Sequence, residues 1–146
     1  MRAFEFPLRR ALEWRRTQLE LAENKLRHMA ADLEELALAA VKLDLVKGRA
    51  EQTVRESHAV DANDLWALGA YRARLIAEQQ ALALRRREYE QRIALQRQNV
   101  LDAQRQCRLL ENLAERRRAE WRIAMDRETE SLAAESFLAL WNRRTS

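Results

Sequence analysis

Hydrophobic residues in the first third of the chain recur at alternating steps of four and three. Starting from Leu8, this spacing selects fourteen positions up to Val54, and only Arg15 and Lys47 among them are polar. The apolar positions are Leu8, Leu12, Leu19, Ala22, Leu26, Met29, Leu33, Leu36, Ala40, Leu43, Ala50 and Val54. An apolar stripe held in phase over so many turns must be buried against a partner, which predicts a coiled-coil seam. We expect a helix over about residues 7–57, starting at Pro7, because a first turn tolerates a missing N–H.

A cluster of short polar residues interrupts this pattern at about residues 58–64, where such residues favour turns and helix caps. A second alternating lattice then runs from Leu65 to Ala124. Polar residues occupy five of its positions, which are Arg72, Gln79, Arg86, Gln96 and Arg117. Apolar residues resume toward the end at Leu132, Phe137, Leu140 and Trp141. These observations predict a second, weaker seam on a helix over about residues 65–141.

The two patterns together predict an all-α fold in which two long helices form an antiparallel coiled-coil hairpin, a single domain over residues 1–146. If the chain reverses near residue 61, Leu8 lies near Ala114. The second helix is the longer one, at 1.5 Å per residue. We therefore expect a carboxyl-terminal overhang after about residue 118. Two alternatives are that Phe4 and Phe6 fold along part of this overhang, or that its end is frayed.

The amino-acid composition then argues against several kinds of functional site. The sequence has 27 Lys and Arg against 23 Asp and Glu, for a formal net charge of +4. Cys107 is the single cysteine, and His28 and His58 are the only histidines, too few for a disulfide or an ordinary zinc site. Gly48 and Gly69 stand alone, so no phosphate-binding glycine loop is present. We expect a cytoplasmic protein that is not an enzyme, with no catalytic residue, metal site, cofactor or small-molecule substrate.

Arginine triplets at residues 85–87 and 116–118 raise the question of nucleic-acid binding. Consecutive helical residues lie about 100° apart, so each triplet is spread around the helix and does not form a basic stripe. Glu88, Glu90, Glu115 and Glu120 dilute the positive charge further. The pattern favours solvated helix faces over a nucleic-acid surface. A nucleic-acid-associated coiled coil nevertheless remains an alternative, as does a generic coiled-coil adaptor.

Three segments carry a resemblance to a known family. They are Phe4-Glu5-Phe6-Pro7-Leu8 with the following Leu12, Arg15-Arg16, Leu19-Glu20 and Ala22-Glu23; residues 66–75 with Tyr71; and Leu110-Glu111-Asn112-Leu113-Ala114-Glu115-Arg116-Arg117-Arg118. In these segments, in helix order and in the place of the break, the sequence resembles the FliJ family, which serves the flagellar type III protein export apparatus. The YscO-type stalks of injectisomes are related to that family, and an injectisome stalk is a further alternative.

The resemblance implies a stalk that regulates and couples an export ATPase during flagellum biogenesis. Its partners would be the hexameric export ATPase (FliI-like), the export-gate membrane protein (FlhA-like) and export chaperones, at the cytoplasmic face of the inner membrane. Carried over onto this sequence, the gate contacts would be Tyr71, Leu75 and Leu82. The exposed aromatic residues and arginines of the overhang would meet the ATPase ring, and they are Arg116, Arg117, Arg118, Trp121, Arg122, Phe137 and Trp141.

Overall fold

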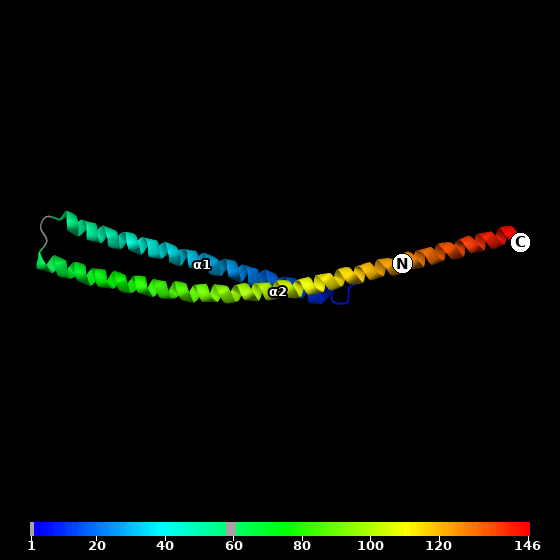
Figure 1. Ribbon diagram of the computed structural model, residues 1–146, viewed down its shortest axis with the longest axis horizontal. Helices are drawn as coiled ribbons and strands as arrows, with labels where there is room; N and C mark the ends of the chain where they lie inside the picture. Colours follow the sequence, from blue (N-terminus) through cyan, green and yellow to red (C-terminus); the bar gives the residue numbers. More distant parts are fainter. Residues whose placement is uncertain (1, 58–60) are drawn as a thin grey trace. The chain divides into compact units, whose positions relative to one another are not determined.

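A computed structural model describes residues 2–57 and 61–146 of the chain. These residues form two α-helices, α1 from Arg9–Glu56 with 48 residues and α2 from Ala62–Thr145 with 84 residues. No strand occurs within the two described ranges. The predicted all-α hairpin of two long helices, the second of them longer, is confirmed (Figure 1).

Contacts divide the chain into two compact units, each of which contains a segment of both helices. The tail unit consists of Met1–Leu19 and Asp102–Ser146, and the body unit of Glu20–Leu101. The expectation that the whole chain forms one domain stays a prediction.

The two helices of the body unit lie side by side and run in opposite directions (Figure 1). Arg72 of α2 forms an ion pair with Glu51 of α1 at 3.3 Å. Further along α2, the Gln79 amide donates to the Asp44 carboxylate. Because the partners on α1 descend in number as the residues on α2 ascend, the pairing is antiparallel.

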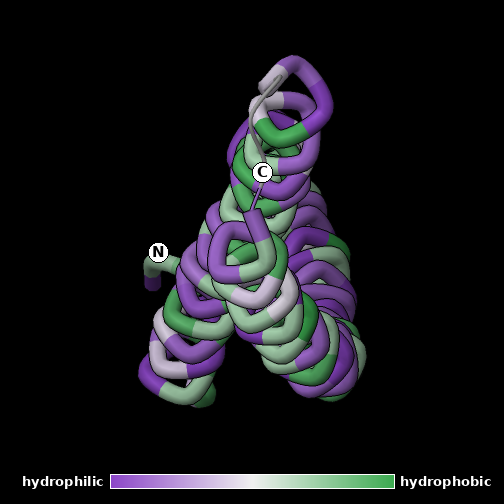
Figure 2. The backbone as a smooth tube through the Cα atoms, turned by 90° about the vertical axis from the view of Figure 1, so that its left-hand side faces the viewer, coloured by the Kyte–Doolittle hydropathy of each residue, from purple (hydrophilic) through white to green (hydrophobic). Residues whose placement is uncertain are grey.

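The seam between the helices is made by the two predicted lattices. Leu75, Ile93 and Val100 are the buried hydrophobic residues of the body unit, at 4, 5 and 8% exposure. In the tail unit the corresponding residues are Leu12 and Cys107. Along both helices, apolar and polar residues alternate and do not gather in blocks (Figure 2). The 4-and-3 spacing predicted these positions because it follows one face of a slightly underwound helix.

Two polar residues lie inside the seam of the body unit. Gln96 is only 5% exposed, and its Nε2 donates to the backbone carbonyl of Ala22 on α1 at 3.0 Å. Its Oε1 accepts a hydrogen bond from Asn99 at 3.3 Å. Arg86 is half-buried, and its Nε has no hydrogen-bond partner within the part of the chain that the structure describes. On α2, the seam therefore contains one polar side chain, Gln96, whose amide forms hydrogen bonds, and one, Arg86, whose buried Nε forms none among the described residues.

The start of α2 differs from the prediction. The helix begins at Ala62, before the predicted Leu65, because Asp61 and Asp64 cap it reciprocally. Asp61 Oδ1 accepts from the backbone N–H of Asp64 at 2.8 Å, and Asp64 Oδ2 accepts from the N–H of Asp61 at 3.5 Å. This is a capping box with aspartate in place of glutamate. The polar cluster that predicted a turn thus supplies the first residues of a helix, while residues 58–60, within the predicted reversal, lie outside the described residues.

The start of α1 also differs, and the difference shapes the amino terminus. The helix begins at Arg9 and not at Pro7. Pro7 instead stands inside a turn closed by a hydrogen bond from the Arg9 N–H to the Phe6 carbonyl at 3.1 Å. Residues 2–6 are neither helix nor strand, and they line a groove against α2.

Within the tail unit, α2 continues well past the residues that accompany it (Figure 1). Trp121 and Met125 are half-buried, whereas every residue from 126 to 146 is exposed. The helix nevertheless extends to Thr145, so the described overhang is not frayed. We call residues 126–146 the bare stretch. It starts later than the predicted residue 118 because the amino-terminal segment follows α2 beyond the first turn of α1.

Candidate functional site

The three residues expected to contact an export gate have unequal access to solvent. Tyr71 is 40% exposed and lines a groove of the body unit with Leu68 and Val54. Leu82 is half-buried and lines a second groove with Val46. Leu75 is only 4% exposed and lies in the seam, so a partner cannot reach it while the helices stay paired. The structure therefore leaves Tyr71 and Leu82 as candidate contacts.

Each of these two grooves is lined by one alanine from α1 and one alanine from α2. Ala39 and Ala81 line the groove at Leu82, and Ala50 and Ala67 line the groove at Tyr71. Charged side chains stand at the first of them, namely Lys42, Glu78 and Arg85. Alanines in a groove between helices permit close approach of another backbone, while the charges can orient it.

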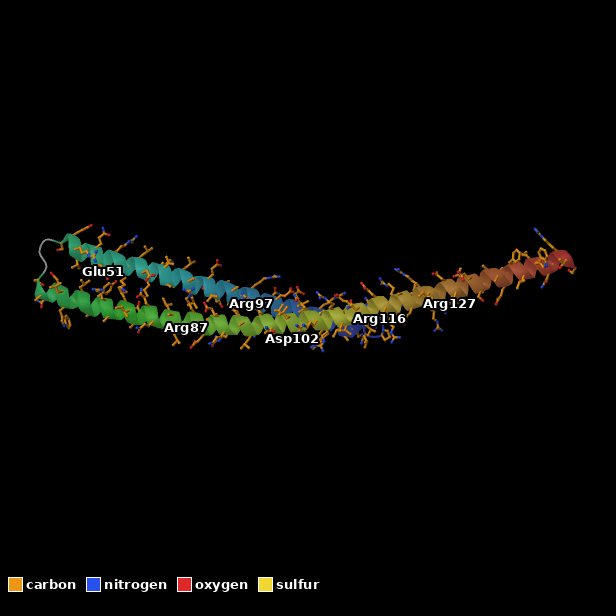
Figure 3. All side chains as sticks on the ribbon, viewed as in Figure 1. Glu51, Arg87, Arg97, Asp102, Arg116 and Arg127 are labelled. Atoms are coloured by element: carbon orange, nitrogen blue, oxygen red, sulfur yellow. The ribbon has the colours of Figure 1, made fainter. Side chains whose placement is uncertain are left out.

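The residues expected at the ATPase ring fall into two groups. The first group, which we call the collar, comprises residues 116–122 of α2, with Arg116, Arg117, Arg118 and Arg122 around the helix and Trp121 half-buried. Figure 3 marks Arg116 in this region and Arg127 on the bare stretch beyond it.

The collar is in contact with the amino-terminal segment. The Phe4 ring packs against Trp121 at a centroid distance of 6.0 Å and an interplanar angle of 55°, a tilted aromatic pair. The Arg118 guanidinium lies over the Phe4 ring, 5.5 Å from its centroid. Arg117 and Trp121 line a groove of about 660 Å³ together with residues 2–8. We call residues 2–6 the clasp.

The second group of expected ring contacts, Phe137 and Trp141, lies on the bare stretch. Their rings stack on each other with centroids 6.4 Å apart and planes 24° from parallel. Both remain more than half exposed, at 64 and 57%, as do Leu132, Leu138 and Leu140. Two aromatic residues at positions i and i+4 of one helix stabilise the turn between them, but the contact buries little of either ring. The bare stretch therefore presents an apolar surface that no described segment of the chain covers.

The sequence patterns did not predict the contact between Phe4 and the collar. They offered folding of Phe4 and Phe6 along the overhang only as one of two alternatives. Phe4 lies outside any helical lattice, so periodicity assigns it no partner. The Pro7 turn is what keeps the preceding residues against α2, because it holds the Phe6 carbonyl on the Arg9 N–H. A proline directly after two spaced aromatic residues was the available signal, since proline fixes the backbone before a helix.

Other features of the described residues add no second site. Within ranges 2–57 and 61–146, no group of three or more His, Cys, Asp or Glu side chains is placed to hold a metal ion. Across the same residues, neither helix is sufficiently long and apolar to cross a membrane. His28 is exposed, as expected from its place off the seam, and His58 lies outside the described residues. No protein-family model, curated protein or solved structure matches the chain.

Proposed function

We propose that this protein is a non-enzymatic stalk of the flagellar type III protein export apparatus. In this proposal it inserts the end of α2 into the ring of a hexameric export ATPase and links that ring to the export-gate membrane protein at the inner membrane. Export chaperones would be further partners. The proposal rests on the resemblance to the FliJ family, and the bare stretch is the structural observation that supports it most.

The bare stretch suits a ring for reasons of size and chemistry. A single helix with its side chains is about 10–12 Å wide, narrower than any helix pair. Phe137, Trp141 and Leu140 are each more than half exposed, so packing inside a ring would remove apolar surface from water. Arg143 and Arg144 in the last turn of α2 favour the helix, because their positive charges lie at the negative end of the helix dipole.

The experiment is ATP hydrolysis by the purified export ATPase in the presence of this protein. Full-length protein should stimulate hydrolysis, and a chain that ends at Met125 should not, although its seam and clasp are complete. The double variant Phe137→Ala and Trp141→Ala keeps the helix length and should also lose most of the stimulation. Leu109→Ala is the matched control, because Leu109 is 70% exposed on α2 outside every candidate surface. Full stimulation by the shortened chain would rule out the bare stretch as the coupling element.

The gate contact is tested separately with Tyr71. Replacing Tyr71 with Ala should weaken binding to the gate protein about tenfold, since aromatic anchors commonly contribute 1 kcal/mol or more. Leu65→Ala is the control, because Leu65 is 57% exposed on the same helix and lines neither groove. Leu75 is not a suitable target, since its loss would disturb the seam. Equal binding of the Tyr71 variant and the parent protein would remove Tyr71 from the proposed contacts.

A further inference from the structure

The collar is the one candidate surface already occupied by another part of the chain. Residues 2–8 line a groove of about 660 Å³ on one side with Leu113 and Trp121. Phe4 and Phe6 line a second groove, of about 620 Å³, with Ala114 and Arg118. The aromatic side chains of the clasp thus have α2 residues on both flanks, which places the clasp over the collar and not beside it.

The clasp is held by few contacts. Phe4 contributes one tilted ring pair with Trp121 and one guanidinium–ring contact with Arg118. Both Phe4 and Phe6 remain half-buried, and residues 2–6 form no helix or strand. The backbone hydrogen bond from the Arg9 N–H to the Phe6 carbonyl marks the end of this segment, and residues 2–5 before it are held by side-chain contacts. These residues can leave without breaking a helix, because the first helical hydrogen bond of α1, from the Leu12 N–H to the Leu8 carbonyl, lies after them.

We propose that the clasp is an autoinhibitory cover: it closes over the collar in the free protein and is displaced when the export ATPase takes the same surface. This inference rests on the proposed function, because it concerns the ring-binding surface of that proposal. The surface then has two parts. Phe137, Trp141 and the collar arginines are exposed at all times, whereas the part of the half-buried Trp121 ring that faces Phe4 becomes accessible only after the clasp has opened.

The expected size of the effect follows from the contacts. An aromatic pair and a cation over a ring each favour the closed form by a factor of about two to ten. Together they hold the clasp closed by about tenfold. A partner that requires the open form therefore binds about tenfold more weakly than it would bind a protein without the cover.

The experiment compares Phe4→Ala with Phe4→Tyr and with the control Leu109→Ala. The first removes the ring, the second keeps a ring that can lie against Trp121, and the third removes an exposed side chain outside the clasp. Helix content should be equal in all of them, because Phe4 precedes α1. Binding to the export ATPase should tighten about tenfold for Phe4→Ala and stay at the parent value for the other two.

A second measurement follows the clasp without any partner. In a protein whose only tryptophan is Trp121, with Trp14, Trp66 and Trp141 replaced by Phe, acrylamide should quench the fluorescence more strongly after Phe4→Ala. Equal quenching would show that the Phe4 ring does not cover Trp121, which would contradict the proposed cover. Weaker ATPase binding by Phe4→Ala would make Phe4 part of the interface, which would contradict the proposal that the clasp and the ATPase compete for the collar.

The two readouts also separate this inference from the proposed function. If no variant and no parent protein binds the ATPase, the proposed function fails and the competition fails with it, while quenching still reports whether the cover exists. If the parent protein binds and Phe4→Ala binds equally, the proposed function stands and the autoinhibitory role of the clasp is overturned.

Discussion

Two lengths of α2 each carry a tryptophan, and the two tryptophans differ in their exposure to solvent. On the length of α2 up to Met125, Trp121 is half-buried because Phe4 lies against it. On the bare stretch, Trp141 stacks only on Phe137, its own neighbour one turn away, and stays 57% exposed. Both lengths are helical, and each added residue of a helix forms one further backbone hydrogen bond, but the burial of an aromatic ring requires a second segment.

The largest contrast between the two lengths should appear when an acidic residue is introduced into each. Ile93→Asp places a carboxylate at a position of α2 that is only 5% exposed in the seam, and it should destabilise the protein by about 3–5 kcal/mol. Leu132→Asp introduces the same group where the side chain is 55% exposed, and it should change stability by less than about 0.5 kcal/mol. Thermal unfolding followed by circular dichroism measures both. Similar losses in the two variants would mean that the bare stretch is covered in solution.

A smaller effect of opposite sign is expected when an arginine is replaced by leucine. Arg86 lies in the seam with its Nε buried and unsatisfied, so Arg86→Leu should raise stability by about 1–2 kcal/mol. Arg127 lies on the bare stretch and is exposed, so Arg127→Leu should leave the unfolding temperature unchanged while adding apolar surface. Chemical denaturation provides the free energies. A loss of stability in Arg86→Leu would show that the arginine is satisfied by solvent.

The smallest contrast concerns Phe4 and Phe137, each of which packs against one tryptophan. Phe4→Ala removes a ring packed on Trp121 and should lower the free energy of unfolding by about 1 kcal/mol. Phe137→Ala removes a ring that is 64% exposed and should lower it by at most a few tenths. Urea titrations of both variants beside the parent protein make the comparison. Equal losses would indicate that Phe137 is buried by something other than Trp141.

The sequence predicted the seam well because periodicity reports which face of a helix is buried. It placed Ile93 and Val100 on the buried face, and even the polar Gln96, which the structure buries against the Ala22 carbonyl. It missed the start of α2 because short acidic residues favour turns and caps alike, and only geometry shows that Asp61 and Asp64 bond to each other.

The candidate site was less predictable, for a different physical reason. The lattice put Leu75 in the seam while the family resemblance suggested it as a surface contact, and the structure supports the lattice. Periodicity is a property of a helix, so it carries no information about the non-helical residue Phe4. The cover over Trp121 depends on a tertiary contact between residues far apart in the chain, which the pattern around either residue does not encode.

The most direct test of the proposed stalk is hydrogen exchange of this protein with and without the export ATPase ring, read peptide by peptide. We predict that the ATPase slows exchange over residues 126–145 and over the collar, and leaves residues 20–101 unchanged. Slower exchange confined to residues 20–101, with no change over residues 126–145, would contradict the assignment of the bare stretch as the element that enters the ring.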